Sequence, residues 1–190
     1  TSYKNLMISK NKILGVMDEP EETGSMETFQ TATHEIRFED VDFSYVPREP
    51  VLKHASFTVP DQKLTAIVGD SGSGKSTILN LIAKYYEAGG GTISIGGKPI
   101  DHVAAERVLE QISMVDQNVF LFDDTIRENI RHARPDATDA EIEAACREAN
   151  CDGFIRKMEK GYDTPTGENG NLLSGGERQR ISIARAILKN

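Results

Sequence analysis

A glycine-rich stretch at residues 69–76 restricts the possible folds of this chain more than any other feature. Its spacing is Gly-x-x-x-x-Gly-Lys-Ser, and an apolar run at residues 64–68 comes directly before it. Such a run is typical of a strand buried in a parallel sheet. Apolar residues at helical intervals follow, at Ile78, Leu79 and Ile82. The order of strand, tight loop and helix predicts an α/β fold.

The same stretch is typical of a loop that binds phosphate groups. Glycines allow the backbone to turn so that successive N–H groups point at a polyanion, and the start of the following helix adds unpaired N–H groups and a positive dipole end. At this spacing Lys75 reaches the β- and γ-phosphates and Ser76 a Mg²⁺ ion, while Thr77 supports the site. The predicted ligand is a Mg-nucleoside triphosphate. The loop alone does not distinguish an ATPase from a GTPase or a small-molecule kinase.

The composition limits the partners. The 190 residues carry a net charge of −8, which argues against a nucleic acid as the main partner because phosphate binding needs an excess of Lys and Arg. No apolar run approaches the about 20 residues that span a bilayer, so we expect a soluble piece. Cys146 and Cys151 lack a Cys-x-x-Cys spacing and a nearby histidine pair, and we expect buried or half-buried thiols in a reducing compartment.

The first 33 residues differ from the rest of the chain. Apolar residues at positions 3–17 fall roughly on one helical stripe, and residues 18–33 have the composition of a linker. A helix of this length has too little surface of its own to be stable. We therefore expect it to pack on a segment outside this chain, with a frayed extension as the alternative. The predicted domain is residues 34–190.

Short antiparallel strands are predicted on both sides of the glycine-rich loop. From His34 the apolar period changes to two, and further strands are expected at residues 55–59 and 92–95, the latter between glycine turns. Tyr45 closes the first of these strands. Its ring either stacks on a nucleotide base or fills the core.

A second candidate binding residue comes at the end of a strand that we predict at residues 112–115. A helix predicted at residues 101–111 precedes this strand. Gln117 lies where this strand ends. Ligands of open α/β sheets bind at the carboxyl ends of strands. Gln117 is therefore either a group that reaches the metal or the attacking water, or a loop glutamine bonded to backbone.

The region from about residue 122 to about residue 160 is predicted to be largely helical. Residues 123–131 begin it, and Thr138 and Glu141 have the spacing of a capping box. A core-facing stripe continues behind the box, at Ile142, Ala145, Cys146 and Ala149.

A second anion cradle is predicted where Ser174, Gly175 and Gly176 precede another amphipathic helix. One chain thus carries two half-sites for phosphate, and one would be redundant if both faced the same ligand. Two chains arranged head to tail would instead bury each nucleotide between the first loop of one chain and the second loop of the other.

Two motifs together, GDSGSGKST at residues 69–77 and LSGGERQR at residues 173–180, resemble those of the nucleotide-binding domain of an ABC transporter, of the exporter type with fused membrane and ATPase halves. The resemblance covers nearly the whole chain. It implies a P-loop NTPase core with a mostly parallel sheet, an antiparallel β subdomain and an α-helical subdomain at roughly residues 122–180. It also implies ATP and Mg²⁺ as cofactors.

The resemblance also implies roles for individual residues. Tyr45 matches the aromatic residue that stacks on adenine, and Gln117 and Ser76 match the protein ligands of Mg²⁺. Glu168, within GENG at residues 167–170, is similar to part of an exporter loop that contacts the partner's membrane region. The implied ATP-binding residues are Tyr45, Gly69, Asp70, Ser71, Gly72, Ser73, Gly74, Lys75, Ser76, Thr77 and Gln117. The implied residues for the partner's ATP are Ser174, Gly175, Gly176, Glu177 and Gln179.

The sequence given ends at Asn190, where the family pattern continues with a strand that carries the Walker B aspartate and the catalytic glutamate. No residue of this chain is therefore expected to be the catalytic base, and we expect these residues alone to be inactive.

The resemblance implies a motor domain in which ATP binding closes a dimer and hydrolysis reopens it to drive export. The expected partners are a second nucleotide-binding domain, in a homodimer or heterodimer, and a transmembrane domain, at the cytoplasmic face of the inner membrane. The alternatives are a soluble ABC ATPase of translation or DNA repair and a P-loop kinase or GTPase. The amphipathic start and the GENG loop favour the exporter, and LSGGERQR argues against the kinase.

Overall fold

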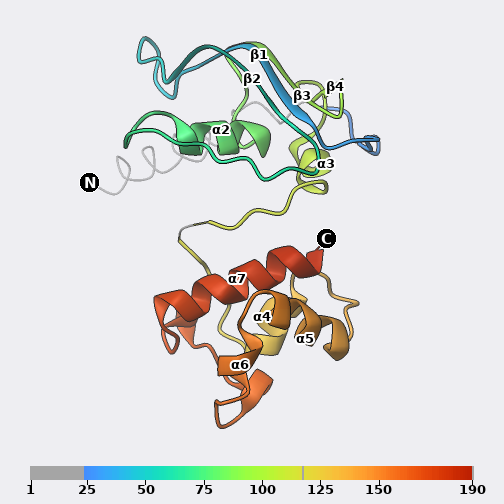
Figure 1. The fold of residues 1–190 in the computed structure, drawn as a ribbon, viewed down its shortest axis with the longest axis vertical. Coiled ribbons are helices and arrows are strands. Elements are labelled where there is room, and N and C mark those ends of the chain that lie inside the picture. The colour runs from blue at the N-terminus through green and yellow to red at the C-terminus, as the bar shows by residue number, and fades with distance from the viewer. Residues whose placement is uncertain (1–23, 117, 190) are drawn as a thin grey trace, which may run out of the picture. The chain divides into compact units, whose positions relative to one another are not determined.

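The computed structural model describes residues 24–116 and 118–189 of the chain. These residues belong to two compact units, Thr1–Gln111 and Ile112–Asn190. The described residues up to Gln111 are called the sheet unit, and those from Ile112 onward are called the helical unit (Figure 1). The amphipathic segment predicted at residues 3–17 and the candidate ligand Gln117 lie outside the described residues.

The sheet unit is built on a four-stranded antiparallel sheet. Its strand order is β2-β1-β3-β4 (Figure 1). Apolar residues of β1 and β3, such as Phe38, Val41 and Ile93, are buried and form the core of the unit. The antiparallel strands that the period of two predicts are therefore confirmed. The strands are β1 (Ile36–Phe43), β2 (Leu52–Val59), β3 (Gly90–Ile95) and β4 (Lys98–Pro99).

A bulge interrupts β1 between Phe38 and Val41. Asp40 lies inside the bulge with a left-handed φ of +55°, and its N–H donates to Ser56 Oγ at 2.9 Å. A Cβ atom on Gly91, whose φ is +78°, would lie 2.3 Å from the Asp40 carbonyl oxygen. The close approach of the two backbones at this bulge therefore requires glycine at position 91.

Two helices complete the sheet unit, α2 (Lys75–Ile82) and α3 (Ala105–Leu109). The buried Lys84 follows α2, and its Nζ donates to the carbonyl oxygen of Asp101 at 3.0 Å and to that of Val103. These two carbonyls accept from a side chain and not from a helical N–H. Ala104 has an extended backbone, with φ −62° and ψ 141°, so α3 begins at Ala105 and is shorter than the helix predicted at residues 101–111.

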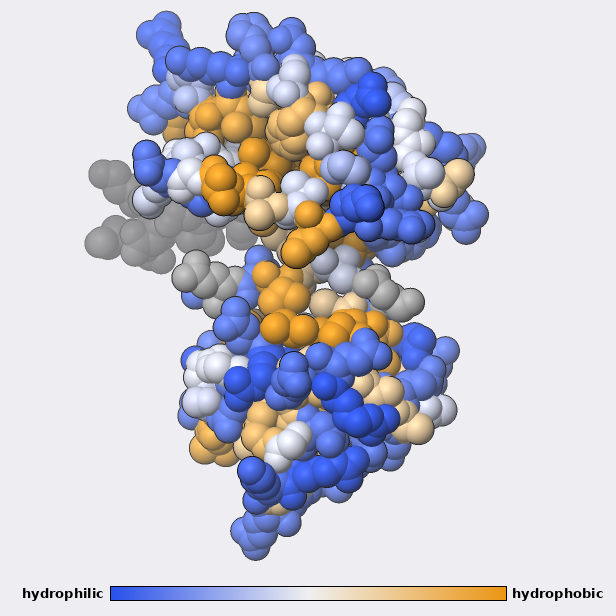
Figure 2. All heavy atoms as spheres, viewed as in Figure 1, coloured by the Kyte–Doolittle hydropathy of each residue, from blue (hydrophilic) through white to orange (hydrophobic). Residues whose placement is uncertain are grey.

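The two buried strands predicted at residues 64–68 and 112–115 are not formed, so these predictions were wrong for the described residues. Val68 is 87% exposed, and Leu64 is fully exposed. Hydrophobic side chains are accordingly visible on the surface (Figure 2). A parallel strand is stable only between neighbouring strands. Within the described residues the one parallel pairing is an isolated bridge between Ser25 and Val103, so neither segment has a partner strand.

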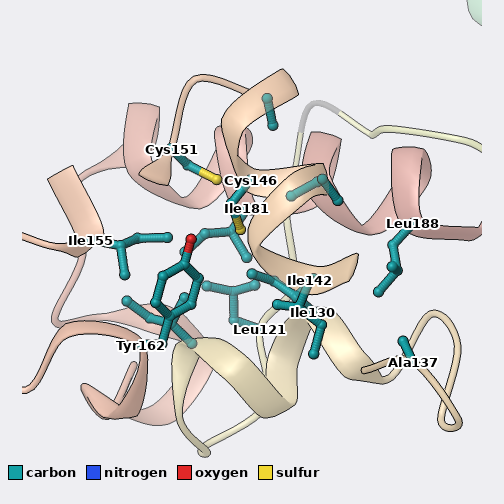
Figure 3. Packing of buried hydrophobic residues seen from close by; sticks show 14 of the residues in the cluster. Leu121, Ile130, Ala137, Ile142, Cys146, Cys151, Ile155, Tyr162, Ile181 and Leu188 are labelled. Atoms are coloured by element: carbon teal, nitrogen blue, oxygen red, sulfur yellow. The ribbon is translucent and has the colours of Figure 1, made fainter. Parts of the chain in front are cut away.

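The helical unit is a small bundle around one hydrophobic core. Ile130, Ile142 and Ile181, which come from three different helices, are fully buried and lie together (Figure 3). Cys146 and Cys151 are free thiols within this core. The helices are α4 (Ile126–Arg131), α5 (Asp139–Glu148), α6 (Asp152–Ile155), η1 (Gly161–Asp163), η2 (Glu168–Gly170) and α7 (Gly175–Lys189).

The local predictions for α5 are confirmed. Thr138 caps the helix, because its hydroxyl accepts from the N–H of Glu141 while the Glu141 carboxylate accepts from the N–H of Thr138. The predicted stripe is buried along its whole length.

None of the helices in the described part of the chain is long and apolar enough to cross a membrane.

Candidate functional site

The glycine-rich loop of the sheet unit turns directly into α2. Gly72 and Gly74 have φ angles of +83° and +89°, in the left-handed region that favours glycine. A Cβ atom at Gly74 would also approach Leu52 Cδ2 to 3.1 Å. The turn therefore depends on glycine at this position, and Gly74 precedes α2 without a side chain that could cap the helix.

The absence of a cap leaves the start of α2 open. The first backbone bond of the helix runs from the N–H of Ile78 to the carbonyl of Gly74 at 3.0 Å. Among the described residues no acceptor is paired with the backbone N–H groups of Lys75, Ser76 or Thr77. Unpaired N–H groups at the positive end of a helix dipole favour an anion at this place.

Lys75 folds over the loop. Its Nζ donates to the carbonyl oxygens of Gly69 at 2.9 Å and Asp70 at 2.7 Å, and lies 3.4 Å from Ser73 Oγ. All three acceptors are neutral groups, and no carboxylate of the described residues forms an ion pair with this ammonium. An anion that enters the loop can therefore replace these contacts with stronger ones, in which donor and acceptor carry opposite charges.

The loop, the start of α2 and Tyr45 enclose an open pocket of about 410 Å³. Tyr45 is 47% exposed and is therefore not a core residue. Its hydroxyl lies 3.1 Å from Thr77 Oγ1. The structure thus brings most of the predicted loop residues together with the predicted aromatic residue. The pocket is lined by Tyr45, Val51, Ser71, Gly72, Gly74, Lys75, Ser76 and Thr77.

The second predicted cradle, at the start of α7, carries its own carboxylate. Both the hydroxyl and the N–H of Ser174 donate to Glu177 Oε2, at 2.7 and 2.8 Å. The N–H of Glu177 donates back to Ser174 Oγ at 3.3 Å. The hydrogen bonds from Ser174 also lower the pKa of Glu177. The Ser174 hydroxyl and the Glu177 N–H are therefore already paired with each other's residue, and an anion bound here would have to compete with these bonds. The Ser-x-x-Glu spacing is a capping-box signal that the sequence analysis missed at this helix.

The GENG loop lies beside the same helix start. Arg178 Nη1 donates to the carbonyl oxygen of Leu173 at 2.8 Å and lies 3.4 Å from that of Gly170. Glu168, Gly175 and Arg178 line one polar cavity of about 630 Å³ in the helical unit. This arrangement connects the loop that contains Glu168 with the turn that contains Ser174.

A buried polar cluster in the helical unit was also missed. Asn129 is fully buried, and its Oδ1 accepts from the N–H of Phe122 while its Nδ2 donates to the carbonyl of Phe122. Thr166 Oγ1 lies 2.8 Å from the same carbonyl oxygen. Arg185 of α7 donates to the carbonyl oxygens of Asn129 at 2.6 Å and Phe120 at 2.7 Å. Burial lowers the pKa of Arg185. No periodicity or spacing in the sequence indicates this cluster, because its members are far apart in the chain.

The predicted site residues thus form two separate groups. Tyr45 and the loop at residues 69–77 belong to the sheet unit, and Ser174 and Gln179 belong to the helical unit. Gln117, the predicted second Mg²⁺ ligand, lies outside the described residues.

Comparisons with known proteins agree with both motifs. A family model described as "ABC transporter" matches residues 52–190. The chain is 48% identical over 156 residues to the "Iron-sulfur clusters transporter atm1, mitochondrial" of Aspergillus fumigatus, covering 82% of this chain and 22% of that protein. It is 42% identical over 193 residues to the "ATP-dependent lipid A-core flippase" of Vibrio parahaemolyticus, covering 100% of this chain and 33% of that protein.

A solved structure of a bacterial Atm1-family ABC exporter with ATP bound matches 98% of this chain and 34% of that chain, with a TM-score of 0.89 and 36% identity. The match confirms the predicted α/β fold class of a P-loop NTPase. The chain spans between 22% and 33% of the length of the two relatives named above.

Proposed function

This chain belongs to the ABC transporter family, and on that premise we propose that it serves as the ATP-driven motor domain of an exporter. One observation supports this proposal most strongly. The uncapped start of α2, a lysine held only by neutral acceptors and an exposed tyrosine all face one open pocket. A nucleoside triphosphate has the matching parts, a polyanion and a planar base.

The residues of this pocket fit ATP and Mg²⁺. The N–H groups of Lys75, Ser76 and Thr77 would bind phosphate oxygens, and the Lys75 ammonium would exchange its carbonyl contacts for the terminal phosphates. The exposed Ser76 hydroxyl, with Gln117, would hold Mg²⁺. Bound Mg²⁺ neutralises charge that develops on the phosphates during hydrolysis.

The start of α7 would complete the site of a second copy or of a related chain. Ser174, Gly175 and Gly176, with Glu177 and Gln179, would face the partner's ATP. Since the Ser174 hydroxyl donates to Glu177 in the structure, it would have to exchange this acceptor for a phosphate oxygen. Glu168 would contact the partner's membrane region. The dimer would lie at the cytoplasmic face of the inner membrane, with residues 1–33 leading from a transmembrane domain to the ATPase domain at residues 34–190.

Hydrolysis needs a general base that the described pocket does not supply. The described residues that line it include neither a carboxylate nor a histidine. Base assistance contributes about 10²- to 10⁴-fold to rates. We therefore expect residues 1–190 alone to bind ATP without turning it over, and sustained phosphate release by these residues would contradict that expectation. The named relatives are transporters, which disfavours a soluble ATPase of translation or DNA repair.

The substitution Lys75→Ala tests the assignment of the pocket. We expect the variant to bind ATP about 10- to 200-fold more weakly, because a charge-assisted hydrogen bond contributes about 1.5–3 kcal/mol. AMP has no terminal phosphates, so its affinity should change little. Titration calorimetry on the full-length protein measures both affinities, and equal losses for ATP and AMP would place Lys75 away from the terminal phosphates.

A further inference from the structure

Tyr86, which neither the sequence motifs nor the proposed site includes, contacts the ring of Tyr45. It lies in the segment between α2 and β3 of the sheet unit. The two ring centroids are 5.0 Å apart, and the ring planes meet at 88°. This is an edge-to-face contact, one of the preferred arrangements of two aromatic rings.

Phe43 connects this pair to the core. Its ring contacts Tyr45 at 4.8 Å with an angle of 89°, and Tyr86 at 5.7 Å. Phe43 is buried at the end of β1, whereas Tyr45 and Tyr86 are exposed. Each of the three rings therefore contacts the other two, and the buried ring anchors the two exposed ones to the sheet.

The hydroxyl of Tyr45 is held as well. It lies 3.1 Å from Oγ1 of the buried Thr77, which belongs to the first turn of α2. Asn80 Nδ2 also donates to the Tyr45 hydroxyl at 3.5 Å. Two ring contacts and two hydrogen bonds thus restrict how Tyr45 can turn. Tyr45 still exposes 47% of its surface, so part of its side chain remains accessible to a planar ligand.

We propose that Tyr86 is a positioning residue for the base of the nucleotide: it holds Tyr45 in the orientation in which the ring stacks on adenine. This inference rests on the proposed function, in which ATP occupies the pocket beside Tyr45. Binding to a ring that is already held avoids the entropy cost of ordering an exposed side chain at the moment of binding. Tyr86 therefore acts on the base and not on the phosphates.

The test compares ATP with inorganic tripolyphosphate, which has the phosphates but no base, by titration calorimetry on the full-length protein. We expect Tyr86→Ala to weaken ATP binding about 3- to 10-fold, the size of one aromatic pair contact, and to leave tripolyphosphate binding unchanged. Tyr86→Phe keeps the ring and should keep the wild-type affinity for ATP. A loss in Tyr86→Phe as large as in Tyr86→Ala would contradict a role of the ring.

Tyr85→Ala is the matched control. Tyr85 is the neighbouring exposed tyrosine, and within the described residues it has no ring contact with Tyr45. We expect this variant to bind both ligands as the wild type does. An ATP-specific loss in Tyr85→Ala as large as that in Tyr86→Ala would overturn the assignment, and so would a loss of both ligands in Tyr86→Ala, which would indicate general damage to the fold.

Tyr45→Ala separates this inference from the proposed function. If Tyr45→Ala does not weaken ATP relative to tripolyphosphate, the base site of the proposed function is wrong. If it does and Tyr86→Ala does not, only the positioning role fails. In the double variant we expect the loss of Tyr45→Ala alone, because Tyr86 acts through Tyr45. Additive losses would show that Tyr86 contacts the base independently.

Discussion

At the level of single residues, two left-handed positions place opposite charges together on the sheet. Asp40 and His54 have φ angles of +55° and +50° in neighbouring strands. His54 Nδ1 lies 2.8 Å from Asp40 Oδ1 and 3.8 Å from Asp42 Oδ2. The hydrogen bond to Asp40 and the charges of both carboxylates raise the pKa of His54. The bulge therefore favours a protonated histidine.

This pKa shift predicts a pH dependence. Because the folded pKa of His54 is raised above its ordinary value, the stabilisation is fully present below about pH 6.5 and is lost as the pH rises through the folded pKa. NMR titration of the His54 ring measures this pKa. Asp40→Asn removes the first cause and should bring the pKa down toward the ordinary value, with an unchanged fold. An identical titration midpoint in both proteins would rule out Asp40 as the cause.

At the level of secondary-structure elements, the hydrogen bonds around Asn129 connect one loop to two helices. The Asn129 side chain from α4 bonds both backbone groups of Phe122, and Arg185 from α7 donates to the carbonyl of Phe120. Buried polar groups of this kind are stable only while every partner is present. We therefore expect the loop at residues 120–122 to keep its position relative to α4 and to the second half of α7.

We expect Asn129→Ala to lower the free energy of unfolding by about 1–3 kcal/mol, because it removes the Oδ1 acceptor of the Phe122 N–H and of Arg185 Nη2. Chemical denaturation of the purified protein measures this loss. Asn118→Ala is the matched control, since Asn118 is exposed in the same unit and its removal should change stability by less than about 0.5 kcal/mol. Equal stability of the two variants would show that the Asn129 bonds contribute nothing net.

At the level of the whole molecule, the two turns predicted to bind phosphate belong to different units of one chain. We propose that each nucleotide needs both turns, one from each chain of a dimer. A mixed dimer tests this for a homodimeric transporter. One subunit carries Lys75→Ala and the other Ser174→Arg, so that one interface contains both changes and the other contains an intact loop and an intact helix start.

We expect the mixed dimer to trap one nucleotide, whereas homodimers of either variant trap none. The measured quantity is occluded nucleotide and not turnover, since a cycle that needs both sites would give no turnover with one intact site. Wild-type dimer serves as the positive control. If the mixed dimer occludes no more than its parents while the wild type does occlude nucleotide, then Ser174 does not complete the partner's site.

Short-range features of this protein could be read from its sequence. The glycine-rich turn before α2, the capping box at Thr138 and Glu141 and the buried stripe of α5 are all present in the structure. Each depends on hydrogen bonds or on helical spacing within a few residues, which sequence order alone determines. The same reasoning applies to the capping box at Ser174, although its signal was overlooked.

Long-range features were decided by tertiary structure. The apolar run at residues 64–68 has the composition of a buried strand, yet Val68 is exposed because the described residues offer no strand to pair with it. Arg185 and Asn129 meet across 56 positions of the chain, and Tyr86 meets Tyr45 only because the sheet brings their segments together. A strand and a buried polar group both depend on partners elsewhere in the chain, and one-dimensional spacing does not identify those partners.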